Sequence, residues 1–129
     1  MGDEGVLKLI DRALAVLLIL GAGGHTLGSI AGYGTQPLTL LWALSASLYI
    51  VLVGAVNLLR TARPGDRALA WIAVVSASCQ LVSAVVFGQL IDAPADPRVV
   101  GFVVLCLGLI AFGLRDALAS RLPEPARPD

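Results

Sequence analysis

Long stretches of this sequence contain no charged residue. No Asp, Glu, Lys or Arg lies between Arg12 and Arg60, and none occurs within residues 68–91 or 99–114. Since a helix crosses the hydrocarbon core of a membrane with about 20 apolar residues, the first run predicts two crossings and each of the others predicts one. A water-soluble fold is excluded, because 57% of the 129 residues are hydrophobic and the mean hydropathy is +0.87.

Other absences narrow the range of possible functions. The net charge is zero, so the chain lacks the basic surface that a nucleic-acid partner requires. There is a single histidine, His25, and the two cysteines, Cys79 and Cys106, fall in apolar segments where they are expected to pack as small side chains. No serine stands in a nucleophile-elbow motif, and the acids that would complete a Ser-His-Asp arrangement, Asp92 and Asp96, lie in a loop. We therefore expect a protein that is not an enzyme.

The charge-free runs predict an all-α, integral membrane four-helix bundle. Its spans are expected at about residues 11–30, 38–59, 67–90 and 97–117. The connections are short, so consecutive helices must be antiparallel neighbours, which gives an up-down-up-down bundle. The predicted organisation is a cytoplasmic amphipathic lead-in at residues 1–12, a single transmembrane domain at 13–119 and a proline-rich, disordered tail at 120–129.

Turn and capping residues indicate where the last two spans begin. Pro64 and Gly65 are a typical turn pair, and Asp66 is placed to cap the helix that follows. Asp96 and Pro97 predict an N-cap followed by the first residue of the last helix.

The distribution of Lys and Arg predicts the orientation of the bundle. Eight of the nine basic residues lie near the termini or between the second and third spans, and these are Lys8, Arg12, Arg60, Arg63, Arg67, Arg115, Arg121 and Arg127. By the positive-inside rule, both termini are cytoplasmic. We expect Arg60, Arg63 and Arg67 to set this topology and to contact lipid headgroups. The brevity of the chain and its richness in Ala, Gly, Leu and Arg indicate a bacterial inner membrane.

Glycines recur on two of the predicted helices. Gly24, Gly28 and Gly32 are four residues apart and therefore share one face of the first helix, and Gly101 and Gly108 form a weaker pair on the fourth. Small residues on one face let two helix backbones approach closely in lipid. We expect these glycines to pack helices within one chain. A homodimer interface is one alternative, and a helix broken to expose backbone groups to a ligand is another.

His25 lies in the outer half of the first span. Counting the helix rise from the predicted ends places several polar side chains near its depth. These are Thr26, Ser45, Tyr49, Gln80 and Ser83. Because lipid offers no hydrogen-bond partners, we expect His25 and these residues to converge inside the outer half of the bundle.

This cluster has three interpretations. The first is a structural network, in which the serines bond to their own helix carbonyls and His25 bonds to Gln80 or a serine. The second is a polar pocket that binds or translocates a small or lipid-like, amphiphilic molecule. The third is ligation of haem or a metal ion by His25, which needs a homodimer or a single axial bond because one histidine is too few for a metal site. We take the pocket as the main functional prediction. The alternative function is an accessory subunit that packs through its glycine-rich faces, and the sequence requires no cofactor.

Overall fold

The computed structural model describes residues 2–119, and every regular element within them is an α-helix. The four helices are α1 (Asp3–Tyr33), α2 (Pro37–Ala62), α3 (Arg67–Leu90) and α4 (Pro97–Leu118). Of these, α2, α3 and α4 are long and apolar enough to cross a membrane. The all-helical prediction is confirmed, and the three apolar helices are consistent with a membrane protein. The tail predicted at 120–129 lies outside the described residues.

The third and fourth helices begin at the predicted capping residues. The carboxylate of Asp66 accepts a hydrogen bond from the backbone N–H of Leu69 at 3.0 Å, and the carboxylate of Asp96 accepts one from the N–H of Arg98 at 2.8 Å. Gly65 has a φ of +85°, a backbone conformation that glycine adopts without strain. The predicted turn and both predicted caps are therefore confirmed.

The helices form two hairpins, because α1 packs most extensively against α2 and α3 against α4. Glycines permit the close approach in each hairpin. A Cβ atom on Gly54 of α2 would lie 2.5 Å from Cγ1 of Ile19, and one on Gly113 of α4 would lie 2.8 Å from Cγ2 of Val74. A Cβ atom at either position would force a neighbouring side chain to shift, and neither position stood out in the sequence.

Fewer contacts join one hairpin to the other. Gly108 of α4 packs against Leu14 of α1, where an added Cβ would lie 2.7 Å from a leucine methyl group. The hydroxyl of Tyr49 in α2 donates to the backbone carbonyl of Ser76 in α3 at 3.0 Å. Between the hairpins lies one apolar cluster, which consists of Ala15, Leu18, Ala22, Ile50, Val53, Ala77, Cys106 and Leu109.

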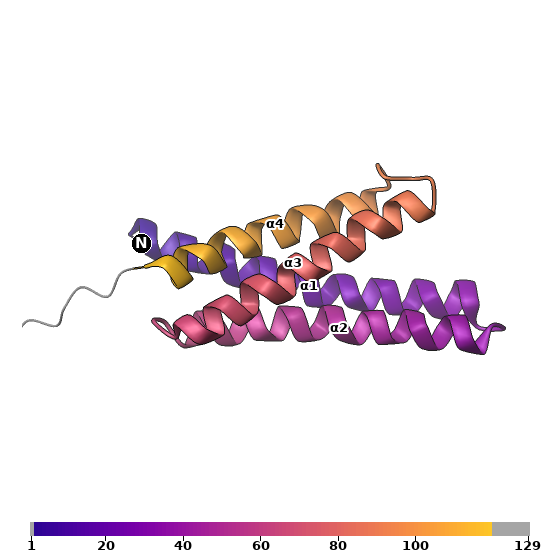
Figure 1. Ribbon diagram of the computed structural model, residues 1–129, viewed down its shortest axis with the longest axis horizontal. Coiled ribbons are helices and arrows are strands. Elements are labelled where there is room, and N and C mark those ends of the chain that lie inside the picture. Colours follow the sequence, from indigo (N-terminus) through magenta and orange to yellow (C-terminus); the bar gives the residue numbers. More distant parts are fainter. Residues whose placement is uncertain (1, 120–129) are drawn as a thin grey trace, which may run out of the picture.

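The two hairpins lie together at one end of the molecule and diverge toward the other (Figure 1). We call the end where α1 begins and α4 ends the charged end, and the opposite end the open end. Large apolar side chains near the open end are exposed, including Leu27 at 71%, Trp42 at 69% and Leu90 at 78%. The arrangement leaves the helices of the open end with less protein around them.

Helix α1 differs from the sequence prediction in its extent. It is one continuous helix from Asp3 to Tyr33, so residues 3–12 form its first turns and not a separate element. Asp3 and Glu4 in the first turn favour this start, because negative charge is stabilising at a helix N-terminus. The glycine-rich segment does not break the helix, so the alternative of exposed backbone groups is not observed.

The glycine stripe of α1 does not pack against another helix of the chain. No atom of residues 2–119 lies within 4 Å of a Cβ added at Gly24, Gly28 or Gly32, apart from the neighbours of each glycine and its own helix backbone. Gly101 has the same open surroundings. Within residues 2–119, these four glycines therefore face open space, whereas Gly108 lies against Leu14 of α1. The reason is the rotation of α1, which turns the face with buried Ala15, Leu18, Ala22 and Ser29 toward the bundle instead.

Candidate functional site

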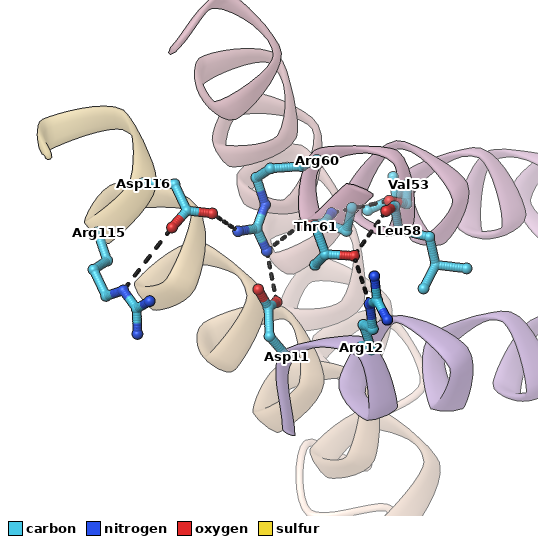
Figure 2. Close-up of polar contacts among 9 residues, drawn as sticks. Asp11, Arg12, Val53, Leu58, Arg60, Thr61, Arg115 and Asp116 are labelled. Atoms are coloured by element: carbon cyan, nitrogen blue, oxygen red, sulfur yellow. Dashed lines mark hydrogen bonds and ion pairs between the residues drawn. The ribbon is translucent and has the colours of Figure 1, made fainter. Parts of the chain in front are cut away.

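Charged side chains connect three helices at the charged end (Figure 2). Arg60, near the end of α2, places its guanidinium between Asp11 of α1 and Asp116 of α4. Its Nη2 donates to Oδ1 of Asp11 at 2.6 Å, and its Nη1 donates to Oδ2 of Asp116. The Nε of Arg115 lies 3.9 Å from the other carboxylate oxygen of Asp116. We call these four side chains, which alternate in charge, the Arg60 network.

The burial of Arg60 corrects a sequence prediction. Its side chain is only 1% exposed, so it does not contact lipid headgroups as expected. Asp11 is buried as well, whereas the side chain of Asp116 is 32% exposed. A buried guanidinium carries a large desolvation penalty unless it is paired, and the two aspartates provide that pairing. The arginine therefore contributes to the interior of the bundle.

The remaining donors of Arg60 are only partly satisfied. Nη2 also donates to the side-chain oxygen of Asn57 at 3.4 Å, and Asn57 in turn donates to the carbonyl of Val53 at 2.9 Å. The buried Nε has no hydrogen-bond partner among residues 2–119. A buried donor without a partner is destabilising. The position of Arg60 thus depends mainly on its two ion pairs.

Two further contacts join helices at the same end. The Nε of Arg12 donates to Oγ1 of Thr61 at 3.3 Å, which links α1 to α2. The Nε of Arg67 donates to the carbonyl of Ala117 at 3.0 Å, which links α3 to α4. Together with the Arg60 network, these contacts tie all four helices at the charged end.

The sequence analysis missed the partners of Arg60. Asp11 and Asp116 fall at the predicted ends of spans, where a charged residue usually faces water or headgroups. A usable signal was present in α2, where polar Ser47, Asn57 and Thr61 recur at helical spacing with buried Ile50 and Gly54 between them. That stripe indicates the inward face of α2, and Arg60 belongs to it.

His25 contacts a residue that the prediction did not include. Its Nδ1 lies 2.8 Å from Oγ of Ser47 on α2, and the ring is half-buried. Ser47 Oγ also lies 3.2 Å from the carbonyl of Ala43, and the hydroxyl of Ser29 donates to the backbone carbonyl of His25 at 2.7 Å. The second ring nitrogen, Nε2, has no hydrogen-bond partner among residues 2–119.

The hydroxyl groups of the predicted serines and threonine form hydrogen bonds within their own helices. The hydroxyls of Thr26, Ser45 and Ser83 each donate to the carbonyl four residues earlier on the same helix, at 2.9–3.0 Å. Ser45 and Ser83 are exposed, because α2 and α3 turn those faces outward. These three residues do not gather around His25.

The two remaining predicted residues lie at separate places. Tyr49 bonds to Ser76 and so joins α2 to α3. Gln80 is buried on α3, and its amide has no hydrogen-bond partner among residues 2–119. The expected hydrogen bond between His25 and Gln80 is therefore not formed, because the hairpins that carry them diverge toward the open end.

The charged residues outside the bundle interior have different surroundings. Arg63 and Arg67 are exposed, and the headgroup role expected for them stays a prediction. In the loop before α4, the carboxylate of Asp96 accepts hydrogen bonds from the side chain of Arg98 at 2.7 Å and 2.9 Å. These bonds, together with one from the Arg98 backbone, lower the pKa of Asp96 to about 2. The pair forms a compact ion pair opposite the charged end.

The chemistry available to these sites is hydrogen bonding and charge pairing. Residues 2–119 contain no group of three or more His, Cys, Asp or Glu side chains placed to hold a metal ion. His25 offers one unpartnered ring nitrogen, and the Arg60 network offers carboxylates that are already paired. No protein-family model, curated protein or solved structure matches this chain.

Proposed function

We propose that this chain is a four-span membrane protein that binds or translocates a small, lipid-like molecule beside His25. The observation that carries the proposal is the state of the imidazole, which Ser47 holds through Nδ1 while Nε2 has no partner within residues 2–119. An oriented ring with one open nitrogen can bond to a hydroxyl or carboxyl group of an amphiphile. The exposed apolar residues around the open end suit its alkyl chain.

Contacts along the helices support the up-down-up-down arrangement. The start of α1 meets the end of α2 through Arg12 and Thr61, and the start of α3 meets the end of α4 through Arg67 and Ala117. The excess of Lys and Arg at the charged end then supports a cytoplasmic location for both termini. We further propose a bacterial inner membrane as the location of the protein.

The Arg60 network supports access of the ligand to His25 from the open end of the bundle. Ion pairs and hydrogen bonds join the helices at the charged end, whereas the hairpins diverge at the open end. A molecule would therefore reach His25 from the outer leaflet or from the periplasmic side. Its binding needs no catalytic step, so we propose a function other than that of an enzyme.

Thermal stabilisation by defined amphiphiles tests the proposal. Palmitate and a lysophospholipid are added to the purified full-length protein, to His25→Ala and to Ser45→Ala. Ser45 is the matched control, because it is exposed and bonds only to its own helix. We expect stabilisation of the natural protein and of Ser45→Ala, and its loss in His25→Ala. Equal responses of the two variants to both amphiphiles would contradict a site at His25.

A second candidate function is that of an accessory or structural subunit. The outward glycine stripe of α1 favours it, because an added side chain at Gly24, Gly28 or Gly32 meets open space. A second copy of the chain or another membrane helix could approach this face closely. We expect Gly28→Leu to dissociate such an assembly, whereas Gly23→Leu, beside the stripe and equally open, leaves it intact. An unchanged oligomeric state in Gly28→Leu would contradict this function.

Ligation of haem or a metal ion by His25 is the third candidate. Its bond to Ser47 leaves Nε2 as the available ligand atom. A visible absorption band in the purified protein that disappears in His25→Ala would support this candidate.

A further inference from the structure

An open groove lies between α2 and α3, away from His25 and the Arg60 network. Its volume is about 450 Å³, and its lining consists of Tyr49, Trp71, Ile72, Val75, Ser76 and Cys79. Trp71, Ile72 and Val75 are between 43% and 59% exposed, so they are open to the surroundings. A groove of this size can hold part of a small molecule.

The two hydroxyl groups of the lining already form hydrogen bonds within the protein. The hydroxyl of Tyr49 donates to the carbonyl of Ser76, and the hydroxyl of Ser76 donates to the carbonyl of Ala73. The surface that remains is apolar, which suits an alkyl chain better than a polar solute. The chemistry of the groove thus selects a hydrocarbon occupant.

The length of the groove along α3 is similar to the thickness of hydrocarbon in one membrane leaflet. Trp71 lies about one turn inside the start of α3, and Cys79 is eight residues further along, which corresponds to about 12 Å of helix. One leaflet contributes about 15 Å of hydrocarbon. Tryptophan also prefers the headgroup level, which places Trp71 at the entrance. An acyl chain of the leaflet at the charged end would therefore fit along the groove.

Two exposed arginines stand at the same end. Arg63 lies in the loop between α2 and α3, and its side chain forms no hydrogen bond or ion pair within residues 2–119. Arg67 lies one helical turn before Trp71. Among residues 2–119 it bonds only through its Nε, so its other donors are available. The nearby Asp66 carboxylate is engaged by the N–H of Leu69, and the loop keeps an excess of one positive charge. Arginine binds phosphate oxygens strongly, often with two hydrogen bonds.

We propose that the α2–α3 groove is a binding site for an anionic phospholipid, with an acyl chain along Val75 and the phosphate at Arg63 and Arg67. The site requires insertion in a membrane but not a ligand at His25, so the two proposals can fail separately. In this proposal, Arg63 and Arg67 bind the phosphate of one lipid molecule, which is more specific than general contact with headgroups.

Native mass spectrometry of the full-length protein in detergent tests this site. Phosphatidylglycerol and phosphatidylcholine with identical chains are added to the natural protein, and the retained lipid is counted. We expect one retained phosphatidylglycerol and a preference over phosphatidylcholine of roughly tenfold, because each arginine near an anionic headgroup adds a favourable contribution. Equal retention of the two lipids overturns the assignment of the headgroup. Displacement of phosphatidylglycerol by inorganic phosphate overturns the assignment to a lipid.

Matched variants locate the site. Val75→Trp fills the groove, and Val82→Trp places the same bulk on an exposed position of α3 outside the lining. We expect Val75→Trp to lose the lipid and Val82→Trp to keep it, with unchanged helical content in both. Arg63→Gln combined with Arg67→Gln should abolish the preference for the anionic lipid, whereas Arg98→Gln at the opposite end should not. Equal lipid retention by the two tryptophan variants overturns the groove as the site.

Discussion

Arg60 and Asp11 form a buried ion pair between the first two helices, with 2.6 Å between Nη2 and Oδ1. The arginine side chain is 1% exposed and that of the aspartate is 7% exposed. Arg60 bounds the long charge-free run, and Asp11 lies one residue before its other boundary, Arg12. Their pairing turns two apparent boundary residues into an internal connection of the bundle.

Loss of Arg60 should destabilise the fold strongly. We expect Arg60→Ala to lower the free energy of unfolding by about 3–5 kcal/mol, because it leaves the buried Asp11 carboxylate without its partner. Unfolding by denaturing detergent in mixed micelles measures the change. Arg63→Ala, at an exposed position in the adjacent loop, should change stability by less than about 0.5 kcal/mol. Similar losses in the two variants would show that burial of Arg60 has no energetic consequence.

A methyl group should be tolerated on one glycine of the first hairpin and not on another. In Gly54→Ala the new Cβ would lie 2.5 Å from a carbon of Ile19 and 3.0 Å from the carbonyl oxygen of Ala15. We expect a loss of about 1–3 kcal/mol from this overpacking. Gly28→Ala faces open space, so its stability should be unchanged or slightly higher. Thermal unfolding of both variants in one detergent makes the comparison, and a stable Gly54→Ala protein would contradict the close approach of α1 and α2.

The Asp96–Arg98 pair gives a specific pH dependence. The pKa of Asp96 is lowered to about 2 by hydrogen bonds from Arg98, compared with an ordinary value of 3.8. The contribution of this carboxylate to stability is therefore present above pH 4 and is lost as the pH falls from about 4 to about 2. Carbon NMR of the Asp96 carboxyl group should show it ionised at pH 3. In Arg98→Gln the pKa should rise toward 3.8, and an unchanged titration would contradict the contribution of the Arg98 side chain.

Site-directed labelling should establish the proposed orientation. In a background with Cys79→Ser and Cys106→Ala, a cysteine is introduced as Arg63→Cys or as Ala95→Cys, both at exposed loop positions. We expect a membrane-impermeant maleimide added outside intact cells to label Ala95→Cys only. Labelling of Arg63→Cys from outside would reverse the orientation and with it the direction of access to His25.

The sequence predicts the positions of the helices better than it predicts which face of each helix is buried. Charge-free runs and capping residues such as Asp66 and Asp96 locate the helices, because span length and N-cap chemistry are local properties. Which way a helix is rotated depends on its neighbours, and this is why Ser47 faces His25 while Ser45 faces outward.

The relative tilt of the hairpins was also not predictable from one sequence. Similar predicted depth suggests that His25 and Gln80 meet, yet depth alone does not bring together helices that diverge. Asp11 and Asp116 show the opposite case, since residues assigned to boundaries converge on Arg60. In both cases the decisive quantity is the packing of one hairpin against the other, which short-range patterns do not encode.

The division of the Arg60 network between helices has a consequence for biosynthesis. Asp11 and Arg60 belong to α1 and α2, so this hairpin contains a counter-ion for its own arginine before α4 is synthesised. The α1–α2 hairpin can thus form with its buried Arg60 already paired, before the ribosome has reached Asp116. When the trailing hairpin arrives, its aspartate completes the ion pairs and docks the second half against the first.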